Sequence, residues 1–174
     1  EFGDADHSLL EDLVGIFFSS PGAYLNVDAL AGDLGRAKAT VRRHLEYLRF
    51  SFIIRLLGNY RGSRRSSSRK MRRVYPYCPA LTAGVEVEVP RLVENLVISH
   101  LNAATYWRER DVEVDIVHDG LPIEVKYKDR LRSDDLDGLR RCMRKLRRPR
   151  GLVESKGTSP LPRAVDGDVE VVPA

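Results

Sequence analysis

Cysteine is scarce in this sequence, and long apolar runs are missing. The two cysteines among 174 residues, Cys78 and Cys142, lie far apart and lack the spacing of metal ligands. A disulfide framework is therefore not expected, and a reducing cytoplasm suits the chain. No apolar run approaches the ~18 residues of a membrane-spanning helix. We expect a cytoplasmic protein with no membrane partner.

Two kinds of site are also missing. No G-x-x-x-x-G-K-[ST] segment occurs, so the chain lacks the loop that cradles the phosphates of ATP, and we expect no ATP hydrolysis. The four histidines are too far apart to form a pair with ligand spacing.

The chain starts with Glu1-Phe2 rather than methionine, and we expect it to be a fragment of a longer protein.

Charge is distributed unevenly along the chain. Residues 61–73 and residues 140–150 each carry seven bases and no acid, whereas residues 109–119 are mostly acidic. Basic clusters of this kind commonly meet the phosphates of nucleic acid. A solvated loop and a solvated helix face are the alternative interpretation.

The first 80 residues contain three helical patterns. The first helix would begin with Ser8 as its N-cap and Glu11 three residues later, in the manner of a capping box. Asn26 would cap a second helix over about residues 27–34, and a third helix would cover about residues 37–50. The buried face of the third helix would consist of Val41, Leu45 and Leu48.

Two strands, at about residues 52–57 and 71–77, flank a basic loop after the third helix. The order helix, helix, helix, strand, loop, strand predicts a winged helix-turn-helix domain over residues 1–80. Its expected partner is DNA, duplex or branched, gripped by the third helix, by the wing from Arg61 to Arg73 and by the basic helix near residue 140. The residues expected to contact nucleic acid are Arg36, Lys38, Thr40, Arg42, Arg43, Arg61, Arg64, Arg65, Arg69, Lys70, Arg140, Arg144, Lys145 and Arg148.

Residues 81–174 predict a second domain, with helices packed on the faces of a mixed sheet. Helices are expected at about residues 91–104 and 133–146, the second of them capped by Ser133. His118-Asp-Gly predicts a hairpin, because Asp-Gly favours tight turns. The strands are expected at residues 106–108, 112–117, 121–127, 151–155 and 169–172.

The segment LPIEVKYKDR alternates apolar and charged residues, as a strand does. Val125 and Tyr127 would face the core, so Glu124 and Lys126 would share the opposite face. That face is either solvated or part of an active site.

A second acid, Asp115, falls on the strand that the hairpin joins to this one. Two carboxylates side by side raise a pKa unless a cation joins them, and such oxygen ligands suit Mg²⁺. Lys126 would hold the nucleophilic water or the pentavalent phosphate, and Glu94 could reach the metal directly or through water. The candidate catalytic residues are Glu94, Asp115, Glu124 and Lys126, the first three as ligands of Mg²⁺ or Mn²⁺.

This set of residues, a helical Glu94, then Asp115, then Glu124-Val-Lys126, resembles the PD-(D/E)XK nuclease superfamily, which includes restriction endonucleases and archaeal Holliday-junction resolvases. The chain is similar in particular to the C-terminal region of prokaryotic, chiefly archaeal, AAA-type ATPases of the DUF234/DUF4143-like kind. The phrases that carry this likeness are ATVRRHLEYL, RLVENLVISHL, ATYWRERDVEVDIV, LPIEVKYK, SDDLDGLRR and VEVVP, which together cover about residues 25–172.

The resemblance implies a restriction-endonuclease-like domain at residues 81–174, with a central mixed sheet flanked by helices. It also implies metal-dependent hydrolysis of phosphodiester bonds, with the ATPase domain of the parent chain and a second copy of the chain as partners. Two other interpretations remain open. The chain could be a DNA-binding or regulatory tail of that ATPase without catalysis, or a protein-interaction scaffold whose charges are only surface.

Overall fold

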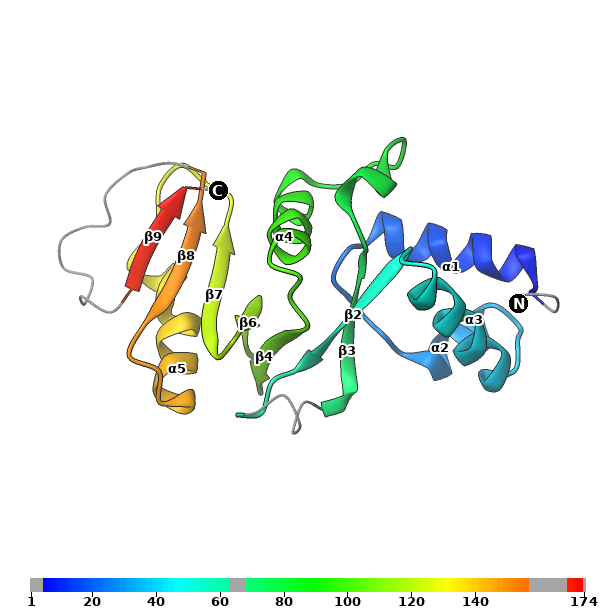
Figure 1. Ribbon diagram of the computed structural model, residues 1–174, viewed down its shortest axis with the longest axis horizontal. Helices are drawn as coiled ribbons and strands as arrows, with labels where there is room; N and C mark the ends of the chain where they lie inside the picture. Colours follow the sequence, from blue (N-terminus) through cyan, green and yellow to red (C-terminus); the bar gives the residue numbers. More distant parts are fainter. Residues whose placement is uncertain (1–4, 63–67, 157–168, 174) are drawn as a thin grey trace.

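The computed structural model describes residues 5–62, 68–156 and 169–173, with side chains described for residues 5–62, 71–156 and 169–172. It is a mixed α/β fold, as the sequence predicts (Figure 1). The helices are α1 (His7–Ser19), α2 (Val27–Asp33), α3 (Lys38–Phe50), η2 (Pro79–Thr82), α4 (Val89–His100), η3 (Ser133–Leu136) and α5 (Asp137–Leu146). The strands are β1 (Ala23–Tyr24), β2 (Ile54–Asn59), β3 (Ser68–Pro76), β4 (Thr105–Glu109), β5 (Val112–Val114), β6 (Ile116–His118), β7 (Leu121–Lys126), β8 (Gly151–Ser155) and β9 (Val169–Pro173).

The starts of α1 and α2 are capped by side chains that accept from the first turn. Asp6 caps α1, with its Oδ1 3.1 Å from the Leu9 nitrogen, so the prediction that Ser8 is the cap is wrong. The extended backbone of Asp6 places its carboxylate over the helix start, and Ser8 already lies inside the first turn. Asn26 caps α2 as predicted, since its side chain accepts from two backbone N–H groups of the first turn.

The predicted helix at residues 133–146 is two elements. A 3-10 turn, η3, begins at Ser133 and gives way to α5 at Asp137. Ser133 is not the cap, because the backbone of Arg132 donates to Asp135 Oδ2 at 2.7 Å and fixes the turn from the residue before.

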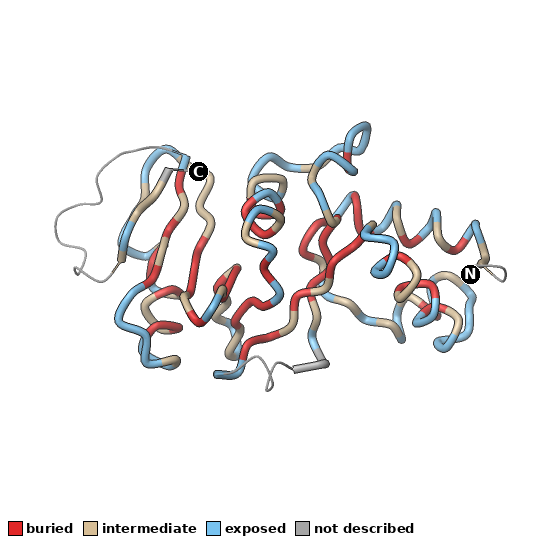
Figure 2. Tube along the Cα trace, viewed as in Figure 1, coloured by how far each residue is buried: buried red, intermediate tan, exposed pale blue. Residues whose placement is uncertain are grey.

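The three N-terminal helices lie at one end of the molecule, and β7, β8 and β9 lie with α5 at the other (Figure 1). Val41, Leu45 and Leu48 of α3 are buried as predicted. They pack in one cluster with apolar residues of α1 and of the first β-strands. Figure 2 shows buried residues continuing from there through the strands at the centre of the molecule.

A five-stranded mixed sheet runs through the middle of the chain in the order β1-β3-β2-β4-β5. β2 pairs antiparallel with β3 and parallel with β4, where Gly58 lies opposite Thr105. This sheet therefore joins strands from both sides of the predicted boundary at residue 80. The second sheet is also mixed and has the order β6-β7-β8-β9.

Asp115 divides the predicted strand at residues 112–117 into two. β5 before it pairs with β4 in the first sheet, and β6 after it pairs with β7 in the second. The predicted hairpin between β6 and β7 is confirmed, because Asp119 and Gly120 both have positive φ, as the tight turn requires. The break places Asp115 at the junction of the two sheets.

Helices α4 and α5 cover opposite faces of β7. Ile123 packs in a cluster with Val97 and Ile98 of α4. Leu139 and Cys142 of α5 belong to a separate cluster with residues of β4, β5 and β8.

Within the described residues, no helix is both long and apolar enough to cross a lipid bilayer.

Candidate functional site

Asp115 and Glu124 meet where the two sheets join. Asp115 Oδ2 accepts a hydrogen bond from the backbone nitrogen of Val125 at 3.0 Å. Because Val125 follows Glu124 in β7, this bond ties Asp115 to the strand that carries the second acid. The structure therefore brings together Asp115, Glu124 and Lys126, three of the four candidate catalytic residues.

The charged face of β7 is not simply solvated. Glu124 is only 6% exposed, and Lys126 Nζ lies 2.5 Å from its Oε1. Ile123 and Val125 pack on the α4 side, so Glu124 points to the other face, toward Cys142 of α5. A buried carboxylate on this face needs a cation, and Lys126 supplies one.

The Asp115–Glu124 junction shifts the titration of the groups around it. Burial, and then the charge of Asp115, raise the pKa of Glu124 to about 8 despite the nearby Lys126. Burial lowers the pKa of Lys126, but the charges of Glu124 and Asp115 outweigh it, so the net shift is upward. Lys126 therefore stays a cation at neutral pH.

Glu94, the fourth candidate, is held by protein donors. Its Oε1 accepts from Tyr75 Oη at 2.6 Å and lies 2.9 Å from Arg73 Nη2. Arg91 Nη1 lies 3.8 Å from the other oxygen. Burial and the charge of Asp115 raise the pKa of Glu94, and Arg73 and Tyr75 oppose this. Glu94 therefore acts on the site mainly by holding the guanidinium of Arg73 in place.

Arg73, the last residue of the predicted wing, is buried rather than exposed. Its side chain is 4% exposed and lies among carboxylates, 2.9 Å from Glu113 Oε1 and 3.7 Å from Asp115 Oδ1. Its Nε also donates to the Gly22 oxygen at 2.9 Å. The pairing of β3 between β1 and β2 turns this arginine inward, beside α4 and β5.

Three residues of the site escaped the sequence reasoning: Arg73, Tyr75 and Glu113. Two signals could have found them. Arg73 and Tyr75 are two apart in one strand and so share a face, and Glu113 shares a face with Asp115 for the same reason. The basic run around Arg73 hid the first signal.

A cavity of about 880 Å³ opens over Asp115, Glu94 and Arg73. Of the described residues, six carboxylates and three arginines line it, so these walls carry more negative than positive charge. The other charged residues are Glu86, Glu88, Arg91, Arg108, Asp111 and Glu113. A phosphate would enter this cavity favourably only with an added cation.

The proposed ligands do not form a three-carboxylate cage here. In the part of the chain that the structure describes, no group of three or more His, Cys, Asp or Glu side chains is arranged to hold a metal ion. Asp115 and Glu124 are adjacent, whereas Glu94 is engaged by Arg73 and Tyr75. Any metal site would thus rest on two carboxylates.

The bases expected on the first half divide into three groups. Arg36 and Lys38 pair with acids, at 3.0 Å to Asp6 and 2.9 Å to Asp28. Arg42 and Arg43 of α3 are exposed, as is Arg61 after β2, while Thr40 is half-buried. Arg64 and Arg65, and the side chains of Arg69 and Lys70, lie outside the described residues.

The bases expected on the second half lie on and just after α5. Arg144, Lys145 and Arg148 are exposed, and Lys145 Nζ lies 2.7 Å from Glu109 Oε1. Arg140 is half-buried and bonds back to Ser133 at the helix start. Arg140, Arg144 and Arg148 line one shallow pocket, whereas Lys145 lines a different one.

Comparison with known proteins gives one match. A family described as "Domain of unknown function (DUF8612)" matches residues 1–85, which cover α1 to η2. No curated protein and no solved structure matches the chain.

Proposed function

We propose that the chain binds nucleic acid and hydrolyses its phosphodiester bonds with a divalent metal, Mg²⁺ or Mn²⁺. In this proposal the N-terminal half is a winged helix-turn-helix and the C-terminal half is a PD-(D/E)XK nuclease-like domain. The parent protein would be an archaeal AAA-type ATPase of the DUF234/DUF4143-like kind. The observation that carries the proposal is the junction of Asp115 with Glu124 and Lys126.

Two carboxylate oxygens at this junction could take a metal. Glu124 Oε2 is buried and has no hydrogen-bond partner among the described residues. Asp115 Oδ1 lies 3.7 Å from Arg73 Nη1, beyond hydrogen-bond distance. Leaving a buried carboxylate oxygen unsatisfied is costly, and a divalent cation would satisfy it. Mg²⁺ binds through one or two carboxylates with waters and phosphate oxygens, so Asp115 and Glu124 fit it.

The protein's own groups would divide the remaining work. A bound metal would neutralise a phosphate oxygen and lower the pKa of a water. Lys126, a cation 2.5 Å from Glu124, would orient the attacking water or hold a phosphate oxygen. Arg73, fixed by Glu94, would add positive charge beside Asp115. Glu94 is then a positioning residue rather than a metal ligand.

The first half supports the nucleic-acid part of the proposal. α2 and α3 are joined by a short turn at Gly35, and α3 exposes Arg42 and Arg43. β2 and β3 follow α3 as an antiparallel pair. This order would suit a winged helix-turn-helix, in which the second helix of the turn reads the groove.

Cleavage of supercoiled and branched DNA with Mg²⁺ or Mn²⁺ tests the proposal. Asp115→Ala and Lys126→Ala should each abolish cutting. Asp111→Ala is the matched control, because Asp111 is an exposed acid on the wall of the same cavity. Cutting that survives both site substitutions, or no cutting with either metal, would contradict the proposed hydrolase activity.

One observation favours a second candidate, a DNA-binding tail without catalysis. Arg73 already pairs with two of the acids around the cavity, with 2.9 Å contacts to Glu94 and Glu113, and so partly takes the place of a metal ion. A chain of this kind would bind DNA with an affinity that falls steeply as salt rises, yet leave it intact with either metal. The cleavage assay, run beside a salt titration of binding, separates the two candidates.

A further inference from the structure

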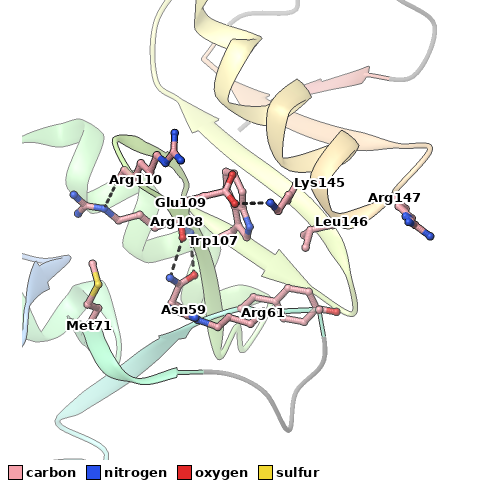
Figure 3. A pocket seen from close by; sticks show the side chains of 12 residues that line it. Asn59, Arg61, Met71, Trp107, Arg108, Glu109, Arg110, Lys145, Leu146 and Arg147 are labelled. Atoms are coloured by element: carbon pink, nitrogen blue, oxygen red, sulfur yellow. Dashed lines mark hydrogen bonds and ion pairs between the residues drawn. The ribbon is translucent and has the colours of Figure 1, made fainter.

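A second cavity, of about 640 Å³, is lined by neither Asp115 nor Glu94 (Figure 3). It forms between the end of β2, the turn from β4 to β5 and the C-terminal end of α5. Figure 3 shows Lys145 and Arg147 coming from α5 on one side, and Asn59 and Arg61 lying on another. With Met71 of β3, four separate segments of the chain thus converge on one cavity.

The charge of this cavity is opposite to that of the first. Among the residues that the structure describes, five cationic side chains line it, and Glu109 is the one carboxylate. Glu109 is already paired, 2.7 Å from Lys145 and 3.7 Å from Arg141. The cations are Arg61, Arg108, Arg110, Lys145 and Arg147. Such an excess of positive charge suits a phosphate.

Two aromatic side chains of a buried apolar cluster form the floor of the cavity. Trp107 and Tyr60 line it and are 3% and 6% exposed. The Asn59 amide fixes β4 from below, through two hydrogen bonds of 3.0 Å with the backbone of Arg108. An apolar floor beneath a basic rim suits a base or sugar attached to the phosphate.

Two of the rim arginines occupy backbone positions where glycine would be easier. Arg110 in the β4–β5 turn has φ +56°, and Arg147 at the end of α5 has φ +54°. Met71, on the same cavity, has φ +57°. Non-glycine residues adopt this conformation at a cost, and such positions concentrate at functional sites. The turns themselves do not require arginine at these two positions, so we expect the two side chains to have another role.

We infer that this cavity binds a phosphate group of a nucleic-acid strand, with the adjoining base or sugar against Trp107 and Tyr60. Arg61, Arg110 and Arg147 would contact the phosphate oxygens, and Lys145 would add charge beside them. The inference rests on the proposed binding of nucleic acid and needs no metal. Arg108 also lines the carboxylate cavity, so a strand held here would lead toward Asp115.

The lone tryptophan makes the inference measurable. Short single-stranded oligonucleotides, with and without a 5′-phosphate, would be titrated into the full chain in EDTA. Trp107 emission would report occupancy of the cavity, and anisotropy of a labelled oligonucleotide would report binding anywhere. We expect a saturable change in Trp107 emission that follows the anisotropy. Tighter binding of the 5′-phosphorylated oligonucleotide would show that the cavity binds a terminal phosphate. Equal affinity for the two oligonucleotides would show that it binds an internal one.

The variants are Arg110→Gly and Arg147→Gly, alone and together. Glycine suits both backbones, so the melting temperature should stay the same or rise, while the double variant should bind about tenfold or more weakly. Arg130→Gly removes the one positive charge that each single variant removes, but from an exposed loop outside the cavity. It should bind like the parent within about twofold.

Binding without a Trp107 response, or weakened equally by Arg130→Gly, would overturn the inference and leave the proposed function standing. No binding by anisotropy at low salt would overturn both.

Discussion

Arg73 of β3 and Glu94 of α4 form a buried ion pair, with 2.9 Å between Nη2 and Oε1. The exposed fractions of the two side chains are 4% and 10%. The same guanidinium reaches Glu113 of β5 and the backbone oxygen of Gly22. One arginine therefore ties the strands of the N-terminal half to the acidic residues of the C-terminal half.

Replacement of Arg73 by alanine should destabilise the fold strongly. Glu94 and Glu113 would be left as poorly compensated carboxylates, and breaking such a buried pair costs about 3–5 kcal/mol. Urea unfolding of the two proteins measures the difference. Arg72→Ala is the control: Arg72 is the neighbouring residue on the same strand, is half-buried, and should cost less than about 1 kcal/mol. Equal losses in the two variants would show that Arg73 has no special structural role.

Glu124 should make the stability of the metal-free chain depend on pH. Below its ordinary pKa of 4.5 the carboxyl is protonated in both the folded and unfolded chain and has no effect. As pH rises, the unfolded chain ionises first, and the folded chain ionises only near the raised pKa of about 8. Stability contributed by this group is therefore lost between about pH 4.5 and 8.

Glu124→Gln isolates this effect, because the amide cannot ionise. The free energy of unfolding of the parent, relative to the variant, should fall on the order of 3 kcal/mol across that interval. Denaturant unfolding in EDTA at pH 5, 6.5 and 8 measures it. A difference that stays constant with pH, or grows in favour of the parent, would contradict a raised pKa.

The two cysteines should differ sharply in reactivity. Cys78 is exposed, whereas Cys142 is buried on α5 and burial raises the pKa of its thiol to about 12. A thiolate-selective reagent should therefore modify Cys78 quickly in the native chain and Cys142 only after unfolding. Mass spectrometry of the labelled chain distinguishes the two. Cys78→Ser should leave no rapidly reacting thiol, and labelling of both cysteines at similar rates would contradict the packing of α5 over β7.

The sequence predicted the elements around the junction well, because the signals there are local. The alternation of LPIEVKYKDR predicts β7, and Asp119-Gly120 predicts the turn before it. Given the hairpin, Asp115 must lie near Glu124. Those two residues and Lys126 could thus be brought together without knowledge of the tertiary structure.

What the sequence did not predict depends on pairing between distant segments. Arg73 shares a strand face with Tyr75, but this spacing alone does not predict which acid Arg73 pairs with. It becomes a partner of Glu94 only because β3 lies between β1 and β2 and faces α4. The strand break at Asp115 was not predicted either: β5 pairs back with β4, β6 pairs forward with β7, and the two hairpins belong to different sheets.

Binding of Mn²⁺ to the purified chain tests most directly the claim that Asp115 and Glu124 share a divalent cation. A titration followed by electron paramagnetic resonance should reveal one saturable site. Asp115→Asn and Glu124→Gln should each abolish it, and Asp111→Asn, on the same cavity wall, should leave it unchanged. No saturable binding, or binding that survives both substitutions, would contradict the account.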